Sequence, residues 1–218
     1  MRLHNPDICD TDNLITFLMA TKSAYNEFVL YHNFRHVVDV LQACFHSLCS
    51  IGALPPYPYA RGKSRAIEGP LSSLIKPFDA LTLLVAAIGH DVGHPGVNNA
   101  FLVVLNSPLA QLYNDQSVLE SFHCAAYSQI LRRHWPACFE STEMRKLMIS
   151  DILATDMGVH FKYMSGMGAL QEKFTHNDHK IDGWNVKQQQ EYRDLLCGLL
   201  IKCADISNVV CSLPPSKY

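Results

Sequence analysis

The sequence lacks the features that mark secreted, membrane-spanning and nucleic-acid-binding proteins. Its start, MRLHNPDICD, contains no apolar signal-peptide core. Apolar runs such as residues 83–88 are far shorter than the roughly 20 residues that cross a bilayer, which predicts no membrane span. With 18 Lys and Arg against 20 Asp and Glu, the chain has no basic excess for nucleic acid. We therefore expect a cytoplasmic protein without a nucleic-acid partner.

Other absences narrow the fold. The eight cysteines form no Cys-x-x-Cys pair and mostly lie among apolar residues, which favours reduced, buried thiols over a disulfide framework. Alternating strand patterns, internal repeats and low-complexity tracts are missing. What is present is a globular composition: 48% of the 218 residues are hydrophobic and 17% are charged, enough for a sizeable core.

Helical periodicity dominates the chain, so the expected fold class is all-α. Asp10 and Thr11 can cap a first helix that runs to Phe28. Further helices are predicted over residues 32–48, 79–90, 117–133, 141–164 and 186–204. Turn-forming proline and glycine interrupt the pattern over residues 52–77, which predicts one long loop.

Histidines and aspartates stand in or at the ends of these apolar helices. The spacing of His32 and His36 would let one imidazole bind a metal and the other face a substrate, although the spacing alone favours one packed and one solvated histidine. His90 and Asp91 close a strongly apolar helix, with His94 just beyond. A buried aspartate needs a partner or a cation, so this pair favours a metal site over a merely polar helix end.

The remaining acidic residues are ambiguous when taken singly. Asp205 follows another apolar helix and is either a metal ligand or a turn former. Glu120 either completes a capping box with Ser117 or supports a metal-bound water or an imidazole. Asp151 and Asp156 share one predicted helix, where most such acids are surface residues.

Five motifs follow one another along the chain: YHNFRHVVDV, GHDVGHPGVNNAFL, SVLESFH, DILATDM and KCADISN. In this order they resemble the class I 3′,5′-cyclic nucleotide phosphodiesterases of the HD superfamily. The long insertion after the first motif looks like that of the fungal high-affinity cAMP enzymes. The resemblance implies a partial catalytic domain over residues 10–210, with the insertion at about 52–77 and an atypical tail at 211–218. Its multi-helix bundle would be incomplete at the C-terminus.

The resemblance also implies an activity and a role for each matching residue. It implies hydrolysis of a cyclic nucleotide, chiefly cAMP in cAMP signalling, to the 5′-monophosphate by a hydroxide held between two divalent ions. These ions would be Zn²⁺ and either Mg²⁺ or Mn²⁺. His32 would be the general acid that protonates the leaving 3′ oxygen, oriented by Glu120. The implied metal ligands are His36, His90, Asp91 and Asp205; the residues around the second metal and its waters are His94, Glu120 and Thr155; the nucleotide pocket comprises Tyr31, His32, Met157, Asp205 and Asn208.

The resemblance stops after Asn208. The later helices of the family, with the glutamine and the aromatic residue that hold the base, have no match here. We therefore expect weak or no turnover by this chain and no basis for choosing cAMP over cGMP. The apolar helix from Leu195 to Cys203 should expose a patch that favours self-association. Two alternatives stay open: an HD-type hydrolase of another phosphate ester, and a non-catalytic metal-binding fragment that binds a partner.

Overall fold

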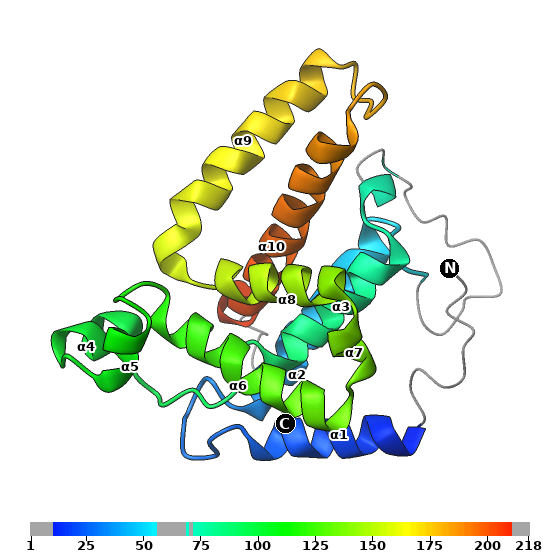
Figure 1. Cartoon of the computed structure of the whole chain (residues 1–218). Helices are drawn as coiled ribbons and strands as arrows, with labels where there is room; N and C mark the ends of the chain where they lie inside the picture. The colour runs from blue at the N-terminus through cyan, green and yellow to red at the C-terminus, as the bar shows by residue number, and fades with distance from the viewer. Residues whose placement is uncertain (1–10, 56–68, 70–71, 211–218) are drawn as a thin grey trace, which may run out of the picture.

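A computed structural model describes residues 11–55, 69 and 72–210, without the side chains of Phe139 and residues 208–210. Every regular element in these ranges is a helix, which confirms the expected all-α fold (Figure 1). The predicted insertion at 52–77 lies largely outside the described residues, and the predicted tail at 211–218 lies wholly outside them.

The helices and two short 3₁₀ turns follow one another along the chain. They are α1 (Thr11–Ser23), α2 (Phe34–Ser50), η1 (Ser72–Leu74), α3 (Pro77–Gly89), α4 (Asn99–Val104), α5 (Pro108–Leu112), α6 (Val118–His134), α7 (Ala137–Glu140), α8 (Thr142–Ala154), η2 (Met157–Val159), α9 (His160–His176) and α10 (Val186–Val210).

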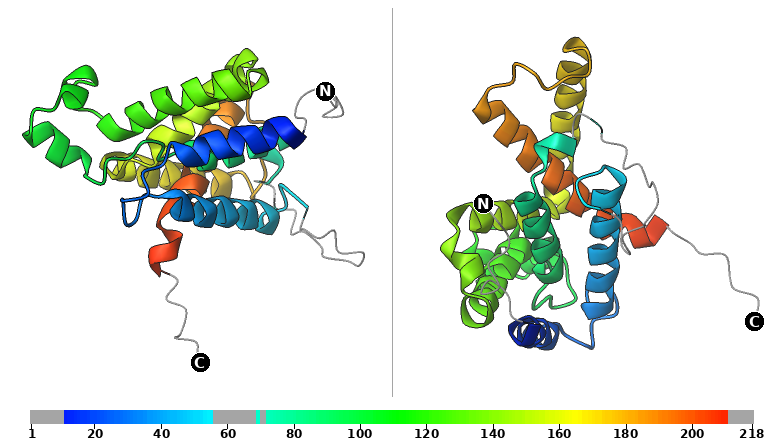
Figure 2. Two further views of the ribbon diagram at one scale, coloured as in Figure 1. Left: turned by 90° about the horizontal axis from the view of Figure 1, so that it is seen from below. Right: turned by 90° about the vertical axis from the view of Figure 1, so that its right-hand side faces the viewer.

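Four helices form the centre of the molecule. Helix α3 packs between α2 and α8, and α10 packs against both of these neighbours. Their facing side chains include Val40, Leu83, Ile152 and Ile201, none of which has exposed surface. Helix α1 runs along α6 on the outside of this core, as the view from below shows (Figure 2). The nearly uniform apolar sequence of α3 is thus explained by its burial on several sides.

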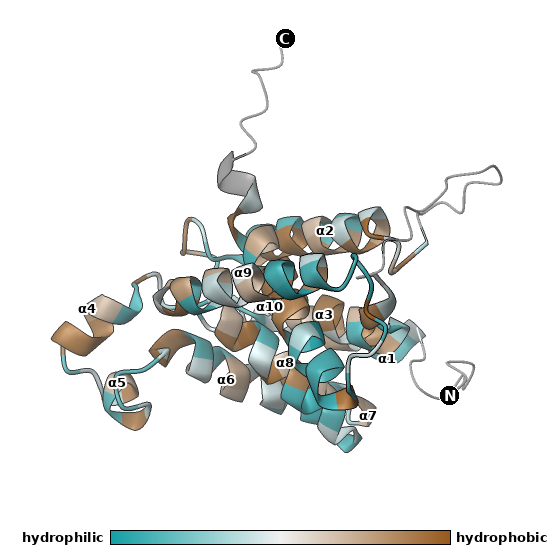
Figure 3. Cartoon of the chain, turned by 90° about the horizontal axis from the view of Figure 1, so that it is seen from above, coloured by the Kyte–Doolittle hydropathy of each residue, from teal (hydrophilic) through white to brown (hydrophobic). Residues whose placement is uncertain are grey.

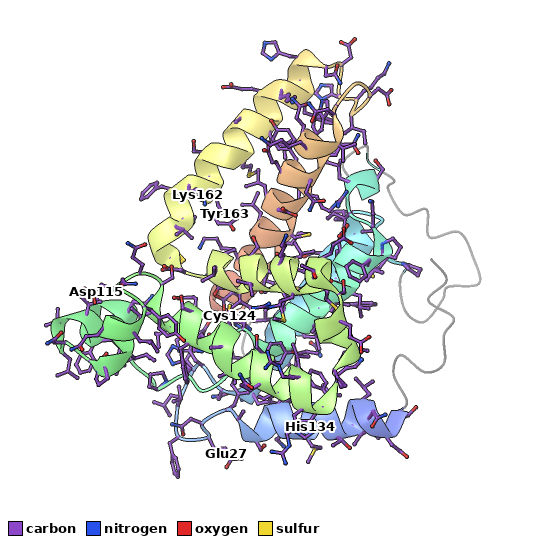
Figure 4. The ribbon with its side chains drawn as sticks, viewed as in Figure 1. Glu27, Asp115, Cys124, His134, Lys162 and Tyr163 are labelled. Atoms are coloured by element: carbon purple, nitrogen blue, oxygen red, sulfur yellow. The ribbon has the colours of Figure 1, made fainter. Side chains whose placement is uncertain are left out.

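Two pairs of helices extend away from the core. Helix α9 and the start of α10 extend from it as a long hairpin, in which Tyr163 projects from α9 toward α10 (Figures 1 and 4). Gly198 makes this approach possible, because a Cβ there would lie 2.5 Å from Cε1 of Tyr163. The short α4 and α5 protrude on the other side and share a small apolar cluster with the start of α6.

Several predicted helix boundaries were wrong, and local hydrogen bonds explain the larger errors. Helix α1 ends at Ser23 instead of Phe28. Helix α2 begins only at Phe34, because the side chain of Asn33 caps it by accepting from two backbone amides. The predicted helix over 141–164 is two helices, since the Asp156 side chain accepts from the amide of Gly158 and turns the chain between α8 and α9. Helices α4 and α5 were not predicted.

The expected apolar patch on the helix from Leu195 to Cys203 is also not found. The large apolar side chains there are buried or half-buried, because α10 packs against α2, α8 and α9. Strongly exposed apolar side chains lie elsewhere, for example Leu30 before α2, and Val104 on α4, whose ribbon is coloured as apolar in Figure 3. None of the described helices combines the length and the hydropathy that a membrane span requires.

Candidate metal centre

An open pocket of about 420 Å³ lies where the turn before α2, the end of α3, the start of α6, the end of α8 and α10 meet. Predicted site residues from all five segments line it: His32, Asp91, His94, Glu120, Thr155, Met157 and Asp205. His36 and His90 lie deeper, with exposed fractions of 3% and 0%. The fold therefore gathers residues that are up to 173 positions apart into one polar pocket with a buried floor.

Four of these residues form the floor. One ligand atom from each of His36, His90, Asp91 and Asp205 lies within 4.8 Å of all the others. His36 Nε2 is 2.8 Å from Asp205 Oδ1 and 3.7 Å from Asp91 Oδ2. His90 Nε2 is 3.3 Å from Asp91 Oδ2 and 3.4 Å from Asp205 Oδ1. Two imidazole nitrogens and two carboxylate oxygens therefore converge on one point, a donor set that suits a divalent transition metal.

The hydrogen bonds of His90 fit a cation at this point. Its Nδ1 lies 2.9 Å from the Ala87 carbonyl and donates to it, so the neutral ring presents the lone pair of Nε2 to the cluster. That Nε2 and Asp91 Oδ2 are both buried, and neither has a hydrogen-bond partner among the described residues. Buried polar atoms without partners are costly, and a metal ion held by both would satisfy them.

The ionisation of Asp91 and Asp205 also favours a bound cation. Burial raises the pKa of Asp91, but His90, His123 and His32 outweigh this effect and hold it well below its usual range. Burial likewise raises the pKa of Asp205, whereas the hydrogen bond from His36 and the nearby His90 ring lower it to about 2. Both carboxyl groups are therefore ionised at neutral pH, and the floor of the pocket is suited to positive charge.

A second group adjoins the first through Asp91. Ligand atoms of Asp91, His94 and His123 also lie within 4.8 Å of one another, and all three residues are buried. His123 donates from Nδ1 to the Val92 carbonyl at 2.8 Å, so its Nε2 lone pair faces Asp91 Oδ1 at 3.8 Å. Sequence reasoning did not select His123. The available signal was its place three residues after Glu120, on the same face of α6.

His94 differs from His123 in which ring nitrogen carries the proton. Its Nδ1 accepts a hydrogen bond from the amide of Gly96 at 3.0 Å, so the proton of the neutral ring is on Nε2. Burial and the neighbouring His32 lower the pKa of His94 to about 4, which keeps the ring neutral. A neutral ring with an N–H at Nε2 can donate to a water or a phosphate oxygen in the pocket.

The structure places His32 differently from the sequence expectation. His32 lies before α2, not on the same helix as His36, and their ring centroids are 6.0 Å apart. Its ring stacks on that of His94, with centroids 3.9 Å apart and an interplanar angle of 13°. No hydrogen bond between His32 and Glu120 is found within the described part of the chain, so the expected orienting role of Glu120 toward His32 is not seen.

Glu120 and Ser117 do not form the capping box that their spacing suggested. Ser117 has φ 41° and ψ 50° and makes no side-chain cap; its hydroxyl donates to Asp156 Oδ2 at 2.7 Å. Glu120 instead accepts from the Asn99 amide at 2.9 Å. Burial raises the pKa of Glu120, and the hydrogen bond from Asn99 opposes that effect. The hydrogen bond from Asn99 on α4, and not a capping box with Ser117, therefore holds the Glu120 carboxylate in the pocket.

The predicted nucleotide-binding residues form parts of the rim. Tyr31 is 39% exposed and its hydroxyl lies 3.4 Å from the Asp205 carbonyl oxygen. Met157 is 57% exposed at the pocket wall, whereas Thr155 is buried and donates its hydroxyl to its own helix. The backbone of Asn208 belongs to α10, and its side chain lies outside the described part of the chain.

Gly89 is needed for the end of α3 to reach this position. A Cβ at Gly89 would lie 2.2 Å from Cδ1 of Tyr127, whose ring packs directly on the helix. The Tyr127 hydroxyl donates to the Val85 carbonyl at 2.8 Å, which fixes the ring against α3. The residue that follows Gly89 is His90, so this contact between α3 and α6 fixes how deeply the His90 ring lies below the pocket.

A helical bundle that gathers histidines and carboxylates on the floor of an open pocket is the arrangement of a metal-dependent hydrolase. The sequence profile described as 3′5′-cyclic nucleotide phosphodiesterase matches residues 31–217. The 3′,5′-cyclic-nucleotide phosphodiesterase 2 of Saccharomyces cerevisiae is 35% identical over 205 residues, and the mouse 3′,5′-cyclic-AMP phosphodiesterase 4C is 31% identical over 211 residues. The chain belongs to the 3′,5′-cyclic nucleotide phosphodiesterase family, as the resemblance of its motifs implied.

The solved structures agree with the sequence relatives. The crystal structure of yeast caPDE2 matches with a TM-score of 0.78 at 38% identity, and the same enzyme in complex with IBMX matches with a TM-score of 0.76 at 37% identity. These alignments cover 95% and 92% of this chain but 41% and 40% of the yeast chains. The yeast and mouse sequence relatives are covered over 31% and 27% of their length, against 93% of this chain in both cases.

Proposed function

We propose that this chain carries the metal-binding part of a phosphodiesterase that hydrolyses a 3′,5′-cyclic nucleotide, chiefly cAMP, to the 5′-monophosphate in cytoplasmic cAMP signalling. The observation that carries the proposal is the convergence of His36, His90, Asp91 and Asp205 beneath the pocket that His32 lines. The similarity to a cyclic-AMP phosphodiesterase of the mouse supports cAMP as the substrate.

The two adjoining groups are suited to two divalent ions, Zn²⁺ at the four-residue floor and Mg²⁺ or Mn²⁺ beside Asp91. Such ions polarise phosphate oxygens and neutralise the charge that develops on them during hydrolysis. Asp91 connects the two positions, because its Oδ2 lies near His36 and His90 while its Oδ1 lies near His123. His94 presents an N–H to the same pocket and can hold a water or a phosphate oxygen.

His32 is the residue of the pocket best suited to protonate the leaving 3′ oxygen. It lines the pocket wall above the floor, and its ring is held in place by stacking on His94. An imidazole can carry a proton near neutral pH and transfer it to an alkoxide leaving group. Burial makes the His32 pKa lower than usual, which favours release of the proton, although the charge of Asp91 opposes this effect.

The proposal is tested by measuring bound metal and turnover separately on the 218-residue chain. Metal content is determined by mass spectrometry for the wild type, for Asp91→Asn and for Asp39→Asn, an exposed carboxylate on α2 that serves as the control. We expect Asp91→Asn to lose metal and Asp39→Asn to retain it. Equal metal content in both variants would contradict the assignment of the cluster.

Turnover is measured with cAMP, cGMP and bis(p-nitrophenyl) phosphate, a general phosphodiester. We expect cAMP hydrolysis, weak in this chain, to be lost in His32→Asn while bound metal is retained. Hydrolysis of only the general diester would favour an HD-type hydrolase of another ester. Bound metal without turnover of any of the three would favour a non-catalytic metal-binding protein.

A further inference from the structure

The first turn of α6 is capped from another helix. Ser117, the residue at the cap position, has a left-handed backbone and gives its hydroxyl to Asp156. The amide of Leu119 would therefore lack a partner within its own helix. Asn99, the first residue of α4, supplies one: its Oδ1 accepts from the Leu119 amide at 2.8 Å.

The other end of the same side chain holds Glu120. The Nδ2 of Asn99 donates to Glu120 Oε2 at 2.9 Å. The backbone amide of Leu119 can only donate, so it requires the oxygen of the Asn99 side chain, and the NH₂ group must then face Glu120. The two contacts determine the orientation of the Asn99 amide without ambiguity, and they bind α4 to two successive residues of α6.

The Glu120 carboxylate lines the pocket together with Asp91, His94 and His123. Burial, Asp156 and Asp91 all disfavour negative charge on Glu120, and the hydrogen bond from Asn99 favours it. Two carboxylates that share one pocket repel each other, and a divalent cation between them relieves this repulsion. Holding Glu120 charged and directed into the pocket therefore strengthens cation binding beside Asp91.

We propose that Asn99 is a positioning residue for the second divalent ion, acting through Glu120 and not through contact with the ion. This inference rests on the proposed two-metal site. It assigns a function to the second asparagine of GVNNAF, whereas the first, Asn98, caps its own helix by accepting from the Phe101 amide.

The test is a double-mutant cycle on the 218-residue chain loaded with one equivalent of Zn²⁺. Binding of Mn²⁺ is followed by electron paramagnetic resonance of the free ion for the wild type, Asn99→Ala, Glu120→Gln and the double variant. We expect Asn99→Ala to weaken Mn²⁺ binding by about tenfold, as the loss of an outer partner of a metal site typically does. If Asn99 acts through Glu120, the double variant should bind Mn²⁺ no more weakly than Glu120→Gln alone.

Two further variants separate positioning from capping. Ser107→Ala removes the cap of the adjoining α5, where Ser107 Oγ accepts from the Ala110 amide, and we expect it to leave Mn²⁺ affinity unchanged. Asn99→Ser keeps a cap acceptor for Leu119, so it folds even if Asn99→Ala does not, but its side chain ends one bond short of the Asn99 amide nitrogen that holds Glu120. We expect Asn99→Ser to show the same loss of Mn²⁺ affinity.

Several results would overturn the inference. They are unchanged Mn²⁺ affinity in Asn99→Ala or Asn99→Ser, losses that multiply in the double variant, and an equal loss in Ser107→Ala. Absence of Zn²⁺ and Mn²⁺ binding in the wild type would refute the metal site together with the role of Asn99. Normal wild-type binding with unaffected Asn99 variants would refute only the role of Asn99.

Discussion

The stability of the protein should depend on pH through a carboxyl group outside the pocket. Asp151 on α8 has no exposed surface, and neither carboxyl oxygen has a hydrogen-bond partner among the described residues. Burial raises its pKa well above the usual range, and the negative charges of Asp194 and Asp79 act in the same direction. The substitution Asp151→Asn keeps the shape of the side chain and removes its ability to ionise.

The sign of the effect follows from the two states of the chain. Below about pH 4 the carboxyl is protonated in both the folded and the unfolded chain. At higher pH the unfolded chain ionises while the folded chain keeps its proton, so folding stability falls as the pH rises. The fall is about 1.4 kcal/mol for each pH unit until the folded-state pKa is passed. Above about pH 5, Asp151→Asn should therefore gain stability over the wild type at about this rate until the folded-state pKa is passed.

The free energy of unfolding is measured by urea titration with circular dichroism at several pH values for the wild type, Asp151→Asn and Asp39→Asn. The difference between two chains isolates one group from all other titrations. Asp39→Asn makes the same chemical change at an exposed position of α2 and controls for effects of the substitution that do not depend on burial. A pH-independent difference between Asp151→Asn and the wild type would show that Asp151 is ionised in the folded protein and would refute the reasoning.

Three further outcomes test the site and its supports. Isothermal titration should show that His36→Ala loses Zn²⁺ binding, whereas His123→Ala chiefly weakens the second ion; equal effects on both ions would contradict the division into two groups. Gly89→Ala should lower the melting temperature and Zn²⁺ affinity, since its Cβ meets an aromatic ring, while Gly168→Ala on α9, with open space around it, should change neither. Lys202→Met should cost about 1–3 kcal/mol of unfolding free energy, because Lys202 Nζ donates to two carbonyls at the end of α8, at 3.0 and 2.8 Å; an unchanged urea midpoint would contradict this.

The local signals of the sequence were sufficient for the fold class, and the ordered motifs proposed the main ligand set. The nearly uniform apolar sequence of α3 predicted a buried helix, and the His90–Asp91 pair was costly to bury without a cation. Ordered motifs then placed His36 and Asp205 with that pair, and the structure brings all four residues together. Their roles as ligands stay predictions that the metal analysis tests.

What the sequence determined by itself is the helical class of the fold and the residue types that a metal requires, because both depend on short-range pattern and on side-chain chemistry. Only the tertiary structure decided which polar groups face each other across helices. It placed His123 beside Asp91, gave the cap of α6 to Asn99, and buried Asp151 with no hydrogen-bond partner among the described residues. Each of these features depends on how different helices pack, and helical periodicity carries no information about which side chain a neighbouring helix will present.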